Sequence, residues 1–185
     1  GCVSSMNVTI KEPNSNLTAS FTQQNVSCNG LGDGSISLIA NGGTAPYTYN
    51  WTGPGTYTSV KQSPAGLAAG QYQFTINDSN GCAYTKTVII KEPDVLQLVL
   101  TTQKNVDCNG NSTGALEVSA KGGTLAYTFN LNSGSYGSAT IFSGLPAGTY
   151  TINVVDKNGC SAKLNPQITE PGALVASASV IDVSC

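Results

Sequence analysis

The sequence predicts an all-β protein built from tandem repeats, and three observations support this fold class. Two short motifs recur along the chain at a spacing of about 80 residues. Apolar residues alternate with polar ones in short runs, and Gly-rich turns separate these runs. No stretch of ten or more residues shows the period of a helix. About seven short strands in each repeat indicate an immunoglobulin-like β-sandwich.

The repeat boundaries follow from the two motifs. The first motif is Gly-Cys followed by Glu-Pro, and its cysteines are Cys2, Cys82 and Cys160, spaced 80 and 78 residues apart. The second motif is a short Val-Ser-Cys or Val-Asp-Cys run that ends at Cys28, Cys108 and Cys185. Together they divide the chain into the last strand of a preceding repeat (1–13), two complete repeats (14–93 and 94–171) and the first strand of a following repeat (172–185).

Strict alternation predicts three strands of the first complete repeat. Their apolar positions are Leu17, Ala19 and Phe21, then Ile36, Leu38 and Ala40, and later Tyr72, Phe74 and Ile76. The turn sequences 29–34, 41–43 and 78–81 lie between strands, and their Asn and Gly residues accept a positive φ at low cost. Each strand is therefore expected to bury one face.

A row of alternating aromatic residues, Tyr47, Tyr49 and Trp51, could form either a stacking platform or part of the core. The aligned residues of the second repeat are Tyr127, Phe129 and Leu131. A platform for carbohydrate needs flat rings, whereas a core needs only apolar bulk, and the leucine satisfies only the second need. The core is therefore predicted to contain Tyr47, Tyr49, Trp51, Tyr72, Phe74, Ile76, Tyr127, Phe129, Leu131, Tyr150, Ile152 and Val154.

Several motifs of the first repeat together resemble the SprB-type repeat. They are Val-Ser-Cys-Asn-Gly, Asp-Gly-Ser-Ile, Gly-Gly-Thr-Ala-Pro-Tyr-Thr-Tyr-Asn-Trp, Gly-Leu-Ala-Ala-Gly-Gln-Tyr, and Asp-Ser-Asn-Gly-Cys with Glu-Pro. That family is known from very large cell-surface adhesins of Bacteroidota, including gliding-motility filaments exported by type IX secretion. The resemblance implies a secreted, extracellular, array-forming protein. The second repeat lacks the counterpart of Asp33, which argues against that residue as a required ligand.

Composition excludes several function classes. Charged residues make up 10% of the chain, His is absent and the formal net charge is −2, so no basic patch for a nucleic acid is expected. No apolar run reaches the roughly 18 residues of a membrane span. The ten acidic residues are scattered, with Glu92 near Asp94 expected on a solvated linker, so we expect no enzyme activity. We also expect no cofactor and no metal, because the Asp78 and Asp156 turns lack the further carboxylates of a calcium loop.

The six cysteines are expected to form structural disulfides in an oxidising compartment. Pairing within each repeat would join Cys28 to Cys82 and Cys108 to Cys160. In an immunoglobulin-like sandwich, however, the first and last strands run parallel, so the two cysteines of one repeat lie at opposite ends. Bonds that cross repeat boundaries avoid this conflict, and they would be either Cys2–Cys28, Cys82–Cys108 and Cys160–Cys185, or Cys28–Cys160. Both boundary-crossing and intra-repeat schemes remain open at this point.

The two repeats differ most in one segment, which covers residues 52–65 in the first repeat and 132–143 in the second. Variable loops on a rigid scaffold often carry recognition, so Tyr57 and Tyr136 are the candidate ligand-binding residues. Two functions follow. The chain is either a stalk or filament shaft of a cell-surface adhesin, or a module that binds carbohydrate or another surface ligand through these loops. The expected partners are neighbouring repeats, other chains of a filament and surface polysaccharide, with no nucleic acid.

Overall fold

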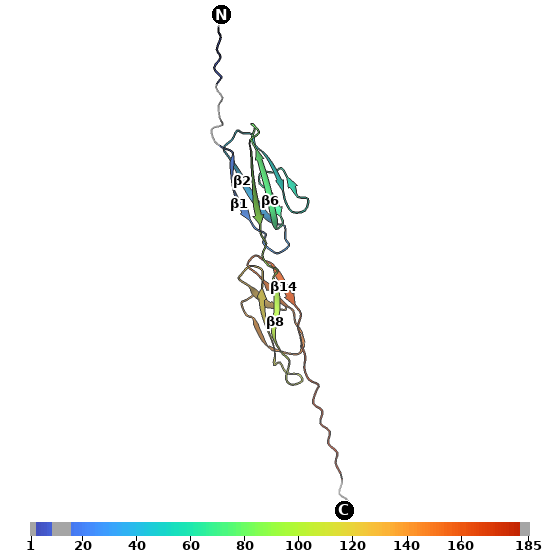
Figure 1. Cartoon of the computed structure of the whole chain (residues 1–185). Coiled ribbons are helices and arrows are strands. Elements are labelled where there is room, and N and C mark those ends of the chain that lie inside the picture. Colours follow the sequence, from blue (N-terminus) through green and yellow to red (C-terminus); the bar gives the residue numbers. More distant parts are fainter. Residues whose placement is uncertain (1–2, 9–15, 182–185) are drawn as a thin grey trace, which may run out of the picture. The chain divides into compact units, whose positions relative to one another are not determined.

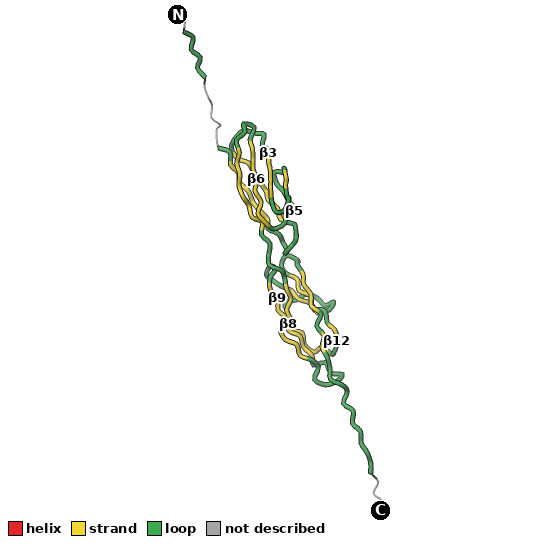
Figure 2. The backbone as a smooth tube through the Cα atoms, turned by 45° about the vertical axis from the view of Figure 1, so that its right-hand side comes forward, coloured by secondary structure: helices red, strands yellow, loops and turns green. Residues whose placement is uncertain are grey.

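The protein is all-β, as predicted. The computed structural model describes residues 3–8 and 16–181, and these residues contain strands and no helix. No helix in this part of the chain could therefore span a membrane. The chain divides into two compact units, Gly1–Glu92 and Pro93–Cys185, each containing one repeat. Figures 1 and 2 show the strands of each unit.

The first repeat is a seven-stranded sandwich of two antiparallel sheets. Its strands are β1 (Thr18–Gln24), β2 (Gly34–Asn41), β3 (Thr48–Thr52), β4 (Thr58–Ser59), β5 (Ala65–Leu67), β6 (Gly70–Asn77) and β7 (Ala83–Ile90). One sheet has the order β1-β2-β5 and the other β4-β3-β6-β7. Splitting the first, second and fifth strands from the others in this way is typical of immunoglobulin-like domains.

The second repeat has the same plan with more interruptions. Its strands are β8 (Gln97–Lys104), β9 (Gly114–Lys121), β10 (Thr128–Leu131), β11 (Ile141–Leu145), β12 (Gly148–Thr149), β13 (Ile152–Val155), β14 (Ser161–Leu164) and β15 (Gln167–Ile168). The sheets are β11-β9-β8, β10-β13-β14 and a short β12-β15 pair. Pro166 stands where the first repeat has Val88, and a proline cannot donate a ladder hydrogen bond. The long hairpin β6–β7 is consequently divided into two shorter pairs in the second repeat.

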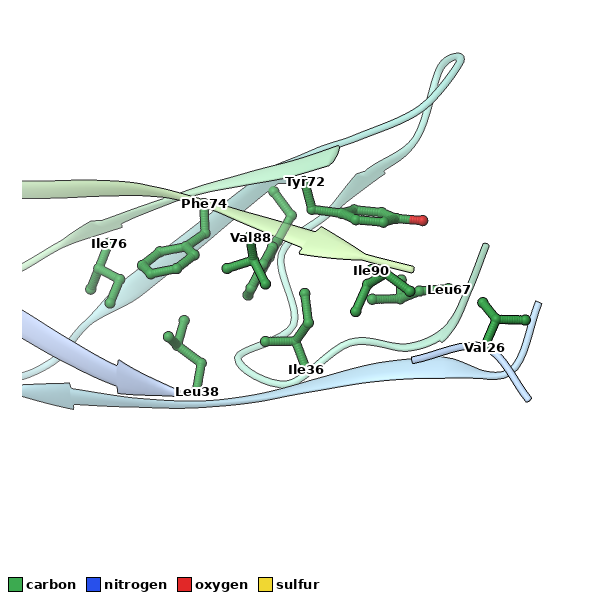
Figure 3. Close-up of a cluster of buried hydrophobic side chains, with 10 residues drawn as sticks. Val26, Ile36, Leu38, Leu67, Tyr72, Phe74, Ile76, Val88 and Ile90 are labelled. Atoms are coloured by element: carbon green, nitrogen blue, oxygen red, sulfur yellow. The ribbon is translucent and has the colours of Figure 1, made fainter. Parts of the chain in front are cut away.

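The core of each repeat lies between its two sheets. Figure 3 shows Phe74 and Ile76 on one sheet of the first repeat facing Ile36 and Leu38 on the other. The buried members of the predicted core are Trp51, Tyr72, Phe74, Ile76, Phe129, Tyr150, Ile152 and Val154. The partly buried members, which pack against these clusters, are Tyr47, Tyr49, Tyr127 and Leu131. Full burial of one large apolar side chain contributes roughly 1.5–3 kcal/mol to folding.

A tyrosine hydroxyl fixes the corner that leads into β6 and its counterpart. Tyr72 Oη donates to the carbonyl oxygen of Ala68 at 3.0 Å, and Tyr150 Oη donates to that of Pro146 at 2.7 Å. A tyrosine bonded to the backbone a few residues upstream is a hallmark of immunoglobulin-like sandwiches. These hydroxyls are thereby satisfied although their rings are buried.

The described residues 3–8 and 172–181 form no strand. A strand needs a partner to satisfy its backbone groups, and neither segment is paired with either sandwich. Their assignment to neighbouring repeats stays a prediction.

Candidate functional site

One end of each repeat is closed by a loop that carries the second cysteine motif, here called the cysteine loop (25–34 and 105–114). Val26 N donates to the carbonyl oxygen of Lys91 at 2.9 Å, and Asn25 Oδ1 accepts a hydrogen bond from Lys91 N at 3.0 Å. Gln23 Nε2 donates to the carbonyl oxygen of Ile89 at 2.7 Å. The partners of these bonds lie further along the second strand as their donors and acceptors lie further along the first, since Gln23 bonds Ile89 whereas Asn25 and Val26 bond Lys91. The end of β1 therefore runs parallel to the end of β7.

The same contacts recur in the second repeat. Val106 N donates to the carbonyl oxygen of Thr169, and Asn105 Oδ1 accepts from Thr169 N. Gln103 Nε2 donates to the carbonyl oxygen of Gln167. The asparagine of the motif therefore extends the pairing beyond the strand with its side chain.

The glutamate of the Glu-Pro motif is hydrogen-bonded to the cysteine loop. Glu92 Oε2 accepts a hydrogen bond from Gly30 N at 2.6 Å, and Glu170 Oε2 accepts one from Gly110 N at 2.7 Å. Charge-assisted bonds of this kind are stronger than neutral ones. Glu92 is exposed, as predicted, and the loop also brings a backbone donor to it from 62 residues away.

A hydrogen bond between a carboxylate and a hydroxyl closes the cysteine loop in both repeats, but the carboxylate comes from opposite ends of the loop. In the first repeat Ser27 donates to Asp33 through both its hydroxyl and its N–H. In the second repeat the carboxylate belongs to Asp107, which accepts from the Thr113 hydroxyl, while Asp107 N donates to Thr113 Oγ1 at 3.1 Å. Since Ser27 aligns with Asp107, the acid and the hydroxyl have exchanged places.

These hydrogen bonds also shift the acidity of both groups. The Ser27 hydroxyl, followed by the Ser27 N–H, holds the pKa of Asp33 below its usual value. The Thr113 hydroxyl does the same for the pKa of Asp107. Each loop contains one bonded pair of a carboxylate and a hydroxyl, with the carboxylate at Asp33 in the first repeat and at Asp107 in the second.

The other end of each repeat is organised by a buried aspartate at the turn before the first cysteine motif. Asp78 Oδ1 accepts from Asn80 N at 3.0 Å and Cys82 N at 2.8 Å, and its Oδ2 accepts from Thr44 N at 2.9 Å. Hydrogen bonds from these backbone N–H groups, Thr44 foremost, lower the pKa of Asp78. The carboxylate therefore joins two loops and sets the direction of the cysteine.

Asp156 repeats this arrangement in the second repeat. It accepts from Asn158 N at 2.9 Å, Cys160 N at 2.9 Å and Thr124 N at 2.8 Å. Gly123 has φ +59°, and a Cβ there would lie 2.6 Å from Asp156 Oδ2. The Gly-Gly-Thr motif thus needs a glycine at this position both for its φ and for the close carboxylate.

The state of the cysteines corrects part of the predicted pairing. Cys28 and Cys160 are each disulfide-bonded, whereas Cys82 and Cys108 are free and exposed. The Cys82–Cys108 bond and the intra-repeat bonds Cys28–Cys82 and Cys108–Cys160 are therefore not formed. The physical reason for the intra-repeat failure is that β7 separates Cys82 from the cysteine loop by eight residues, about 26 Å of strand.

Neither bonded cysteine is paired with the other cysteine of its own repeat. The first complete repeat (14–93) contains only Cys28 and Cys82, and the second (94–171) only Cys108 and Cys160. Because Cys82 and Cys108 are free, the partner of Cys28 cannot be the other cysteine of its repeat. The Cys2–Cys28 and Cys160–Cys185 pairs include cysteines outside the described residues, and Cys28–Cys160 stays a prediction.

The family model described as the SprB repeat matches residues 20–56 and 100–135. The chain carries SprB-type repeats. Both matches include the cysteine loop and the strands on either side of it. The SprB repeats make the chain a segment of a repeat protein of the cell surface or extracellular space. A search of curated proteins found no match.

The variable segments of the two SprB repeats contain regular pairing that sequence reasoning missed. Segment 52–65 includes β4, which pairs with β3, and segment 132–143 holds a bridge between Phe129 and Gly137. Neither β4 nor the single bridge is long enough to show a hydrophobic period, so the sequence pattern carries no signal for them.

The two candidate tyrosines have different surroundings. The Tyr57 ring packs edge-to-face on Tyr72, with centroids 5.2 Å apart, and is partly buried against the core. Tyr136 is 50% exposed and lies beside Asn153 and Lys163. The structure therefore gives Tyr57 a packing contact and leaves Tyr136 open to solvent.

The residues that the structure describes include no group of three or more His, Cys, Asp or Glu side chains able to hold a metal ion. The Asp78 and Asp156 carboxylates, which superficially resemble calcium ligands, accept hydrogen bonds from three backbone N–H groups each. This chemistry suits a structural turn.

Proposed function

We propose that this chain is a shaft segment of a secreted adhesin of the gliding-motility type, as in Bacteroidota, and that its repeats place an adhesive element far from the cell. The observation that carries the proposal is that Cys28 is disulfide-bonded while Cys82, the other cysteine of residues 14–93, is free. A bond between Cys28 and Cys160 would join the two repeats covalently, as a shaft requires and independent binding modules do not. In repeat arrays, stability is roughly a sum of repeat and boundary terms.

Cys28–Cys160 is the bond that the geometry of each repeat favours. The cysteine loop of the first repeat is bonded to Glu92, the last residue of its unit, through Gly30 N. In the second repeat, Gly123 N donates to the carbonyl oxygen of Asp94 at 2.8 Å, and the neighbouring Thr124 N donates to Asp156. Each cysteine therefore lies at the end of its repeat where the Glu92-Pro93-Asp94 connection is attached.

Non-reducing peptide mapping tests this bond. Cleavage after lysine places the six cysteines on six different peptides, because a lysine separates every neighbouring pair. Free thiols are first blocked at acidic pH, and the digest is then analysed by mass spectrometry. A Cys28–Cys160 linked pair, with blocked Cys82 and Cys108, is the expected result. A Cys28–Cys82 linked pair would overturn the shaft proposal and leave independent repeats.

The maximum dimension of the chain in solution gives a second, functional readout. Cys28→Ser is expected to broaden the distribution of dimensions measured by small-angle X-ray scattering, because the repeats then move independently. Cys82→Ser is the matched control, since this thiol is free and exposed. Equal effects of both substitutions would contradict a stiffening role for the Cys28 bond.

A further inference from the structure

The second repeat carries a row of polar and aromatic side chains across the outer face of one sheet. Phe129 is bridged to Gly137, so the next residues, Asn130 and Tyr136, lie opposite each other. Asn130 pairs with Asn153, and Asn153 pairs with Lys163. We call Tyr136, Asn130, Asn153 and Lys163 the outer row. It crosses four adjacent chain segments, about 14 Å at the usual strand spacing.

Three members of the outer row line a hollow that is open to solvent. Tyr136, Asn153 and Lys163, together with Ser161 and Ala162, surround a volume of about 330 Å³ that is open to solvent. Phe129 and Val154, on alternate positions of the same strands, are buried in the core. The row is therefore held by strands whose other face is fixed by packing.

Hydrogen bonds fix the orientation of the central amides. Asn153 Nδ2 donates to Asn130 Oδ1 at 2.8 Å, and Asn130 Nδ2 donates to the carbonyl oxygen of Gly134 at 3.1 Å. Asn130 is 7% exposed and forms the floor of the row. Within the described residues Asn153 Oδ1 accepts no hydrogen bond, so it can accept one from a ligand hydroxyl.

The charged end of the outer row is Lys163. Its side chain is exposed, and no carboxylate of the described residues lies within 4.0 Å of its ammonium group. An aromatic ring, a fixed amide and an ammonium group in one row suit a chain of sugars that carries carboxylates. The ring can cover the apolar face of one sugar, the amide can bind hydroxyls, and the lysine can bind an acidic group.

The first repeat does not have this chemistry. Asn50 pairs with Thr75 and Thr75 with Thr85, and the two threonine hydroxyls bond each other at 2.9 Å. Val60, which follows the Trp51 partner Ser59, takes the place of Tyr136 and is 80% exposed. The equivalent row is therefore Val60, Asn50, Thr75 and Thr85, without a ring or a charge.

We propose that the outer row of the second repeat binds an acidic polysaccharide, and that the first repeat does not. This binding function is additional to the shaft and does not depend on it. The open hollow suits a polymer that lies across the sheet, since an enclosed pocket would be expected for a small molecule.

The test measures binding of hexagalacturonate by the whole chain, using chemical-shift titration at low salt with a neutral galactose hexamer as comparison. The unmodified chain is expected to bind the acidic oligomer at least tenfold more tightly than the neutral one. Tyr136→Ala and Lys163→Gln are each expected to weaken binding at least tenfold, whereas Tyr136→Phe retains it. Lys121→Gln, on β9 of the other sheet, makes the same charge change and is expected to leave binding within twofold.

A graft provides the gain-of-function arm. Val60→Tyr, Thr75→Asn and Thr85→Lys together transfer the outer row to the first repeat, and a second binding event is expected. Melting curves of every variant check folding, and these positions lie on the outer face of their sheet. No binding of hexagalacturonate, equal binding of the neutral hexamer, or equal losses in Lys163→Gln and Lys121→Gln would each overturn the proposal. These outcomes leave the shaft proposal unaffected, because the disulfide map tests it separately.

Discussion

The two repeats hold their ends by the same hydrogen bonds but differ along one edge of one sheet. At the ends, Glu92 and Glu170 bind equivalent backbone N–H groups, and so do Asp78 and Asp156. At the edge, β4 of the first repeat is replaced by a single bridge at Gly137. The difference teaches that the ends position the linkers and cysteines and require fixed geometry. Among the described residues no further strand pairs with the outer side of this edge, so it can acquire new side chains.

The largest expected difference between the repeats comes from the core. Trp51 is fully buried, donates from Nε1 to the carbonyl oxygen of Lys61 and contacts Phe74, while its counterpart Leu131 is only partly buried. Trp51→Ala should lower the free energy of unfolding of the first repeat by about 3–5 kcal/mol, and Leu131→Ala should lower that of the second by less than about 2 kcal/mol. Calorimetry of the whole chain measures both losses, and equal losses would contradict the expected difference between the fully buried Trp51 and the partly buried Leu131.

Removal of the buried aspartates should give the next largest loss of stability, of similar size in both repeats. Asp78→Ala and Asp156→Ala each remove the acceptor of three backbone N–H groups, so each should lower the melting temperature of its own repeat by several degrees. Asp78→Asn retains one acceptor oxygen and should lose less. Melting followed by circular dichroism measures the change. An alanine variant as stable as the unmodified chain would show that the turn does not need its carboxylate.

Substitution of the two candidate tyrosines should lower stability by different amounts, because one ring is packed and the other is exposed. Tyr57→Ala removes an edge-to-face contact with Tyr72 and should destabilise the first repeat by about 1–2 kcal/mol. Tyr136→Ala removes a half-exposed ring and should change stability by less than about 0.5 kcal/mol. Urea unfolding measures both. A larger loss of stability for Tyr136→Ala than for Tyr57→Ala would contradict this expectation and would indicate that the Tyr136 ring packs against the core.

Acid should weaken both repeats. The pKa values of Asp33 and Asp78 in the first repeat are lowered, as is that of Asp107 in the second. A lowered pKa in the folded state gives stability that is complete above the unfolded value, near 3.9, and is lost as the pH falls through the folded value. Trp51 is the only tryptophan, so its fluorescence follows the first repeat, while circular dichroism follows both. If neither signal changes as the pH falls below about 4, the expectation is contradicted.

The smallest effect is expected from exchanging the cysteine-loop pair. Ser27→Asp with Asp33→Thr gives the first repeat the arrangement of the second and should leave its melting temperature nearly unchanged. Ser27→Asp alone places two carboxylates together, and Asp33→Thr alone removes the carboxylate that Ser27 binds, so each single variant should be less stable. Additive losses in the double variant would show that the two arrangements are not interchangeable.

Much of the fold was predictable because its long strands have one buried face. Ile36 and Leu38, or Phe74 and Ile76, alternate with polar residues for long enough to show the period of two. The opposite ends occupied by Cys28 and Cys82 also followed from the parallel first and last strands. In contrast, the Glu92 and Asp78 contacts join residues far apart in sequence to backbone N–H groups, which carry no side-chain signal. The outer row was equally hidden, because its register depends on one bridge at Gly137.

The parallel course of β1 and β7 has a consequence for how a repeat responds to tension. The chain enters the sandwich at Thr18 and leaves it after Ile90, and the ends of these strands are joined by the Gln23–Ile89, Asn25–Lys91 and Val26–Lys91 hydrogen bonds. A pull applied through the two ends of the repeat slides the strands along each other, so these bonds are stretched together and are not opened one after another. Forced unfolding is governed by the unfolding rate, which falls when several bonds must break in one step. Each repeat is thereby suited to carry tension along the chain without unfolding.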